Sequence, residues 1–111
     1  MDDREQLKMA AKAAGIHWNR WDYERLRDLG HMVTPSMMWN PLNNDGDALR
    51  LAVNLRIDID YDELEPRVEA YHKVLGEDSH FCADECMEPD PAAATRRAIV
   101  RAAAELGKAM P

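Results

Sequence analysis

The hydrophobic period of the chain changes at Arg56, and this change constrains the fold more than any other feature of the sequence. Before Arg56, apolar residues recur at a spacing that places them on one face of a helix, namely Ala48, Leu49, Ala52 and Val53, with Leu55 alongside. After it, Ile57, Ile59 and Tyr61 alternate with aspartates, which is the period of a half-buried strand. We therefore predict a helix that ends near Arg56 and leads directly into a strand.

A turn and a cap are predicted just before this helix. Pro41 restrains Asn40 to an extended backbone, and the run from Asn43 to Gly46 consists of residues that favour turns. Asn44 or Asp45 is expected to be the N-cap, because each side chain can accept hydrogen bonds from the first free helical amides. The negative charge of a residue in the first turn also complements the helix dipole. Structural roles in the turn and cap are assigned to Trp39, Pro41, Asp45, Gly46 and Asp47.

The stretch Trp39–Leu55, read as WNPL-x-x-DGDALRLAV-x-L, resembles the phage ABA-sandwich domain family of small bacteriophage proteins. The run from Asp90 to Gly107 is similar to the last helix of that family, and the two blocks together cover about a third of the chain. The resemblance implies a sheet between helices and an origin in a phage or prophage, and it implies no activity. The family usually has Gly where this chain has Arg56. Because Arg in a left-handed cap costs roughly 1 kcal/mol relative to Gly, we expect either Asn54 to take that conformation or the exit geometry to differ.

Two further helices are predicted, one at each end of the sequence. Asp2 or Asp3 is expected to cap the first helix, and Gly15 to end it. Asp90 and Pro91 are the expected N-cap and first residue of the last helix, and Gly107 its expected end. The predicted packing face of the last helix consists of Ala92, Thr95, Ile99, Ala102, Ala103 and Leu106.

The alternation of apolar and polar residues predicts further strands over 16–22, 31–34 and 67–74. Tyr23–Leu29 fits either a short helix or a loop. Residues 76–88 show no clear period, so we expect a loop with at most one short edge strand near Phe81. The whole chain, 1–111, is predicted to be one α+β domain. Its expected form is an α/β/α sandwich in which helices cover a small antiparallel or mixed sheet, in the order α-β-β-α-β-β-α.

The charge of the chain is concentrated in one segment. Residues 58–90 contain 12 acidic and 2 basic side chains, whereas residues 91–111 contain 1 acidic and 4 basic ones. A general nucleic-acid binder needs the opposite balance, so direct binding of nucleic acid is not expected. The sequence also contains no long apolar run and no secretion signal, so we expect no membrane association and place the chain in the host bacterial cytoplasm.

The strongest candidate for a metal site is His80-x-Cys82-x-x-x-Cys86 with His72 upstream. Its spacing does not match the short paired spacings of structural zinc sites, and the motif itself supplies only three of the four ligands that zinc needs. Two free thiols in an acidic segment are the favoured interpretation, and the nearby carboxylates would suppress a reactive thiolate. We therefore predict no metal, no cofactor and no catalytic residue.

Two charged surfaces are candidates for binding another molecule. One is acidic and comprises Asp58, Asp60, Asp62 and Glu63, for which a solvated strand face is the simpler interpretation. The other is a basic stripe on the last helix, comprising Arg96, Arg97 and Arg101. These arginines could instead form ion pairs inside the domain with acidic residues of the sheet.

The leading hypothesis for function is a non-enzymatic phage accessory protein that binds a host or phage protein. A first alternative is an inhibitor that mimics DNA, in which the acidic segment occupies the DNA-binding surface of a host protein. A second alternative is a small metal- or ligand-binding module. A homodimer is possible through a sheet edge or through Met37–Trp39.

Overall fold

The computed structural model describes residues 2–16, 39–62, 64–73 and 80–111. These residues form the helices α1 (Asp3–Ala14), α3 (Asp45–Leu55) and α4 (Pro91–Ala109) and the strands β1 (Asp58–Asp62), β2 (Arg67–Lys73) and β3 (His80–Cys86). The strands form an antiparallel sheet in the order β1-β2-β3. The predicted α+β class, with a small antiparallel sheet covered by helices, is confirmed. The stretches 17–22, 23–29 and 31–34 lie outside the described residues.

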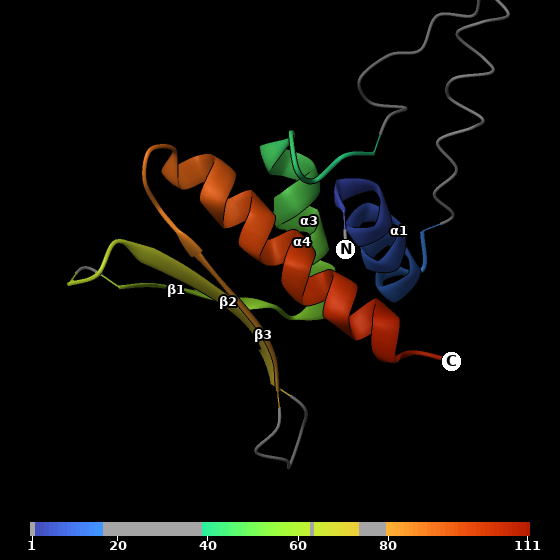
Figure 1. The fold of residues 1–111 in the computed structure, drawn as a ribbon. Helices are drawn as coiled ribbons and strands as arrows, with labels where there is room; N and C mark the ends of the chain where they lie inside the picture. The colour runs from blue at the N-terminus through green and yellow to red at the C-terminus, as the bar shows by residue number, and fades with distance from the viewer. Residues whose placement is uncertain (1, 17–38, 63, 74–79) are drawn as a thin grey trace, which may run out of the picture.

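Helix α4 organises the packing of the described elements. It lies across the sheet, and α3 and α1 pack against it on the same side of the sheet (Figure 1). The buried core is built largely from alanines of α1, α3 and α4, together with Leu51, Val68, Ile99 and Val100. The core contains few large residues, and its small side chains allow the helices and the sheet to approach closely.

The ends of α1 and α4 follow from their capping residues. The side chain of Asp2 accepts a hydrogen bond from the backbone N–H of Glu5 at 2.8 Å, and Gly15 ends α1 in the left-handed conformation. The side chain of Asp90 accepts from the backbone N–H of Ala93 at 3.1 Å at the start of α4. Helix α4, however, continues past Gly107 to Ala109, so the prediction that Gly107 ends it is wrong. Gly107 is buried inside the helix, and its role is in packing.

Helix α3 has its N-cap at Asn44, whose side chain accepts from the backbone N–H of Asp47 at 2.9 Å. The helix ends at Arg56, which itself adopts the left-handed conformation with φ 57° and ψ 45°. Both expectations for the end of this helix are therefore wrong: Asn54 does not take the left-handed conformation, and the helix does not end with a different geometry. The backbone N–H of Ile57 donates to the carbonyl of Ala52 at 2.9 Å, which completes the cap that a glycine usually forms.

The buried face of α3 differs from the predicted one. Ala48, Leu51 and Ala52 are buried, whereas Leu49 and Val53 are 61% and 63% exposed. Apolar residues cover more than half of the circumference of this helix, so its sequence permits two overlapping apolar stripes. The packing against α4 selects the stripe that contains Leu51.

The short edge strand expected near Phe81 is present and is longer than expected, because residues 80–86 pair with β2 along their whole length. The signal for β3 in the sequence is weak for a physical reason. Its inward side carries a small residue, Ala83, and a charged one, Glu85, and Glu85 is held by an arginine of α4. Hydrophobic alternation therefore does not mark this strand.

Candidate functional site

The predicted basic stripe of α4 is largely engaged within the domain. The Arg96 guanidinium donates through Nε to the carbonyl oxygen of Leu42 at 2.8 Å and through Nη1 to Asp45 Oδ1 at 2.6 Å. Arg101 Nη1 donates to Glu85 Oε1 at 2.8 Å and to the carbonyl oxygen of Asp84 at 2.9 Å. Arg101 thus pairs with an acidic residue of the sheet, as one of the two interpretations expected, while Arg96 connects α4 to α3. Arg97, between them, is exposed.

The predicted acidic residues Asp58, Asp60 and Asp62 lie on the outer face of β1, away from the helices. Asp62 also has a local structural role, since its Oδ1 accepts from the backbone N–H groups of Leu64 and Glu65 at 3.0 and 3.3 Å. Glu63 lies outside the described residues. The acidic surface is therefore an exposed sheet face that ends in a turn.

A row of three carboxylates crosses this outer face, because the strand register places Asp60 opposite Glu69 and Glu69 opposite Asp84. Like charges directly opposite each other destabilise a sheet. Arg67 offsets part of this repulsion through an exposed ion pair with Asp84 at 2.8 Å. A hydrogen bond to Asp60, together with the negative charge around it, raises the pKa of the neighbouring phenol of Tyr71.

An apolar groove lies on the other side of β1, between this strand and the N-terminal halves of α3 and α4. The groove has a volume of about 570 Å³ and opens to solvent. Leu49 of α3 and Tyr61 of β1 line it, and both are more than half exposed. The remaining lining residues are Asp45, Ala48, Ile59, Met87, Pro91, Ala92, Thr95, Arg96 and Ile99.

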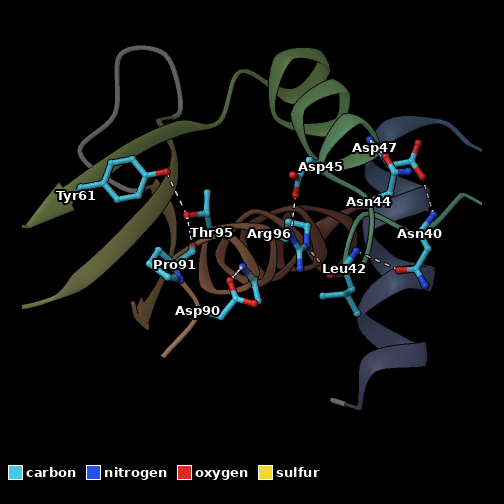
Figure 2. Close-up of polar contacts among 11 residues, drawn as sticks. Asn40, Leu42, Asn44, Asp45, Asp47, Tyr61, Asp90, Pro91, Thr95 and Arg96 are labelled. Carbon is cyan, nitrogen blue, oxygen red and sulfur yellow. Dashed lines mark hydrogen bonds and ion pairs between the residues drawn. The ribbon is translucent and has the colours of Figure 1, made fainter. Parts of the chain in front are cut away.

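Polar contacts fix the walls of this groove. The hydroxyl of Tyr61 lies 3.1 Å from Thr95 Oγ1, and the hydroxyl of Thr95 donates to the carbonyl oxygen of Pro91 at 2.8 Å, which holds β1 against α4 (Figure 2). On the opposite wall, Arg96 connects α4 to Asp45 at the start of α3 (Figure 2). The two walls are therefore anchored to neighbouring residues of the same helix, Thr95 and Arg96.

The turn before α3 supports the second wall. Asn40 Oδ1 accepts from the backbone N–H of Leu42 at 3.1 Å, and the backbone N–H of Asn40 donates to Asp47 Oδ2 at 3.0 Å (Figure 2). Pro41 is fully buried, and Trp39 is half-buried against the core. The turn predicted from the sequence therefore positions the carbonyl oxygen of Leu42, which accepts a hydrogen bond from Arg96.

The groove presents a largely apolar surface with few polar groups. Its two charged lining residues, Asp45 and Arg96, pair with each other, and the rest of the surface is mostly carbon. In the part of the chain that the structure describes, no three His, Cys, Asp or Glu side chains are placed to hold a metal ion. Of the candidate metal ligands, Cys86 is an exposed free thiol, whereas the side chains of His80 and Cys82 lie outside the description.

Sequence reasoning did not identify the groove. Leu49 was assigned to the buried face of α3, and Tyr61 to the inward side of a half-buried strand. Tyr61 does lie on the same side of β1 as Ile59, but the exposure of Leu49 and Tyr61 makes them the rim of a surface site. A usable signal was the surplus of apolar residues around α3, which exceeds what one buried face needs.

None of the helices in the described ranges is both long and apolar enough to span a membrane. Comparison of the chain with protein-family models, with curated protein sequences and with solved structures gave no match.

Proposed function

We propose that this chain is a non-enzymatic accessory protein of a phage or prophage, that it acts in the host cytoplasm, and that it binds a host or phage protein through the groove beside β1. The resemblance of Trp39–Leu55 and Asp90–Gly107 to the phage family supports the origin. The observation that carries the binding role is the exposure of Leu49 and Tyr61 on the rim of an open apolar groove with fixed walls.

The shape and lining of the groove favour a protein over a small molecule. Pockets for small ligands enclose most of the ligand surface and present a few convergent polar groups. This groove is open, and its charged lining residues already satisfy each other. A protein partner needs only to insert one or two apolar anchor side chains, and such anchors supply much of the affinity of an interface.

The test compares two substitutions on the exposed side of α3. Leu49→Asp places a charge on the rim of the groove, whereas Val53→Asp places the same charge one turn further along at a site of nearly equal exposure that does not line the groove. Both sites are exposed, so both variants should fold. Tagged wild-type and variant proteins are used to capture partners from host lysate, with washes at low and at high salt.

The expected result is a protein that wild type and Val53→Asp retain at high salt and that Leu49→Asp loses, with an affinity at least about tenfold weaker once the partner is purified. Equal capture by all three proteins would overturn the assignment of the groove. Capture that is independent of position 49 and disappears at high salt would instead support the alternative of a DNA mimic.

The DNA-mimic alternative draws support from the row formed by Asp60, Glu69 and Asp84 on the outer face of the sheet. It predicts retention of DNA-binding proteins at low salt only, since interactions between exposed charges are screened by salt. Under this alternative Asp60→Asn would weaken capture, whereas Leu49→Asp would leave it unchanged.

A further inference from the structure

Strand β1 is the edge of the sheet that borders the groove. Within the described residues, β1 pairs only with β2, over Asp58–Asp62. Four of its five residues are exposed, and the fifth, Ile59, is half-buried. An edge strand presents unpaired backbone N–H and C=O groups along one side, and these groups can pair with another extended chain.

The two faces of β1 differ in chemistry. Ile59 and Tyr61 face the groove, whereas Asp58 and Asp60 face solvent on the outer side. The inward residues of the central strand, Val68 and Ala70, are fully buried, so coverage by the helices is incomplete only toward the edge. Side chains of an added strand would alternate between these two environments.

We propose that β1 accepts an extended segment of a partner protein as a fourth strand, and that this segment alternates apolar and basic residues. The apolar side chains enter the groove beside Ile59 and Tyr61, and the basic side chains pair with Asp58 and Asp60. This proposal rests on the proposed function, in which the groove binds a protein, and it specifies the backbone conformation and charge pattern of the bound segment.

Charge complementarity selects this occupant over a second copy of the chain. Pairing of β1 with another β1 would bring aspartates close to aspartates on the outer face, and like charges across strands are unfavourable. The segment 58–90 carries 12 acidic and 2 basic side chains, so its field attracts a basic partner and repels a second copy. A segment that alternates basic and apolar residues can pair with the aspartates on the outer face and fill the groove on the inner face at the same time.

The probe is a short synthetic peptide that alternates lysine and valine, with a fluorescent label for anisotropy measurements on the full chain. A first control peptide has the same composition in an order that breaks the alternation. A second carries N-methyl groups on the backbone amides of one edge, which removes ladder hydrogen bonds while keeping every side chain. We expect the alternating peptide to bind at least about tenfold more tightly than either control, because ladder bonds and register supply the affinity.

Variants of the protein test the two faces separately. The double substitution Asp58→Asn/Asp60→Asn should weaken binding about two- to tenfold and reduce its dependence on salt, as expected for exposed ion pairs. Leu49→Asp should weaken binding through the groove, whereas Asp3→Asn, an exposed aspartate of α1, should have no effect. Hydrogen exchange should show new protection of β1 amides when the peptide is bound.

The outcomes separate this inference from the proposed function. Equal binding of the N-methylated and unmodified peptides, or no binding of the alternating peptide at millimolar concentration, would overturn strand addition. So would full protection of the free-edge amides of β1 without peptide, since the edge would then already be occupied. In each of these cases the proposed function would still stand if the wild-type protein captures a partner from host lysate and the Leu49→Asp variant does not. If the partner is retained by Leu49→Asp, the proposed function fails as well.

Discussion

Gly107 of α4 packs directly against the main-chain carbonyl of Met9 in α1. A Cβ atom placed on Gly107 would overlap the carbonyl oxygen of Met9 and would lie 2.7 Å from its carbonyl carbon. The two helices also meet where Lys12 Nζ donates to the carbonyl oxygen of Met110 at 3.0 Å. Because the obstructing atoms belong to the backbone of a helix, they cannot rotate away, and the crossing of α1 and α4 depends on glycine at this position.

Gly107→Ala is therefore expected to destabilise the domain by about 1–3 kcal/mol, the range typical of an overpacked core. The direction of this change in stability is informative, because alanine in the interior of a helix otherwise stabilises by roughly 0.5–1 kcal/mol relative to glycine. Urea unfolding measures the difference. Gly46→Ala in α3 is the comparison: the atoms nearest its Cβ, at 3.2 Å, belong to the side chains of Arg50 and of the N-cap Asn44 and not to the backbone, so a smaller change than that of Gly107→Ala is expected. A Gly107→Ala protein as stable as wild type would show that the helices tolerate a wider crossing.

Arg56→Gly is expected to stabilise the domain by about 1 kcal/mol, because Arg56 has a left-handed backbone that L residues adopt with strain and glycine adopts freely. Asn54→Gly, two residues earlier in the helix, should have the opposite effect and destabilise by about 0.5–1 kcal/mol. Thermal and urea unfolding of the two variants measure both effects. If Arg56→Gly instead destabilises the domain as much as Asn54→Gly does, then contacts of the Arg56 side chain stabilise the domain by more than its backbone strain destabilises it.

Arg96→Ala is expected to destabilise the domain by about 1.5–3 kcal/mol, because the partly buried guanidinium makes a charge-assisted hydrogen bond to the Leu42 carbonyl in addition to its ion pair. Only 18% of the Arg96 side chain is exposed, against 78% of that of Asp45. Asp45→Ala should therefore cost less than about 1 kcal/mol, as for other exposed partners. Arg97→Ala should fall within about 0.5 kcal/mol of wild type. Urea unfolding of the three variants distinguishes a role in anchoring the turn from a simple ion pair, for which Arg96→Ala and Asp45→Ala would have equal effects.

The features that sequence reasoning predicted correctly are those set by neighbouring residues. Asp2 and Gly15 delimit α1 through local hydrogen bonds and a left-handed backbone, and both are visible as residue types at the right spacing. The change from helix to strand at Arg56 is also local, because the hydrophobic period changes there. Such signals do not depend on what the element packs against.

The features that sequence reasoning missed depend on distant residues. The length of strand β3 was underestimated, because the strand places Glu85 on its inward side. This is possible because Arg101 of α4 lies opposite, and this partner is not visible from the sequence of β3 alone. Gly107 has the residue type of a helix end, but the close approach of Met9 gives it a different role. The groove was missed for the same reason: the exposure of Leu49 depends on how α3 sits against α4 and β1.

The phenol of Tyr71 is expected to titrate above its ordinary pKa of about 10, because Asp60 accepts its hydrogen bond and the charges of Asp60, Asp58 and Glu69 disfavour the phenolate. Asp60→Asn should lower this pKa toward the ordinary value, whereas Asp84→Asn, which changes an acidic residue paired with Arg67, should lower it little. The measurement is the absorbance of tyrosinate against pH, taken as the difference between the protein and its Tyr71→Phe variant so that the other tyrosines cancel.

The same shift predicts how stability depends on pH. A pKa raised in the folded state means that the unfolded chain loses its proton first, so the contribution of Tyr71 is fully present below about pH 10 and is lost as the pH rises through the folded pKa. The free energy of unfolding should therefore decline less steeply at alkaline pH in Tyr71→Phe and in Asp60→Asn than in wild type. Equal slopes in all three proteins would show that Tyr71 does not donate to Asp60 in solution. The outer face of β1 would then present a carboxylate without a phenolic donor, and the salt dependence of peptide binding should be correspondingly steeper.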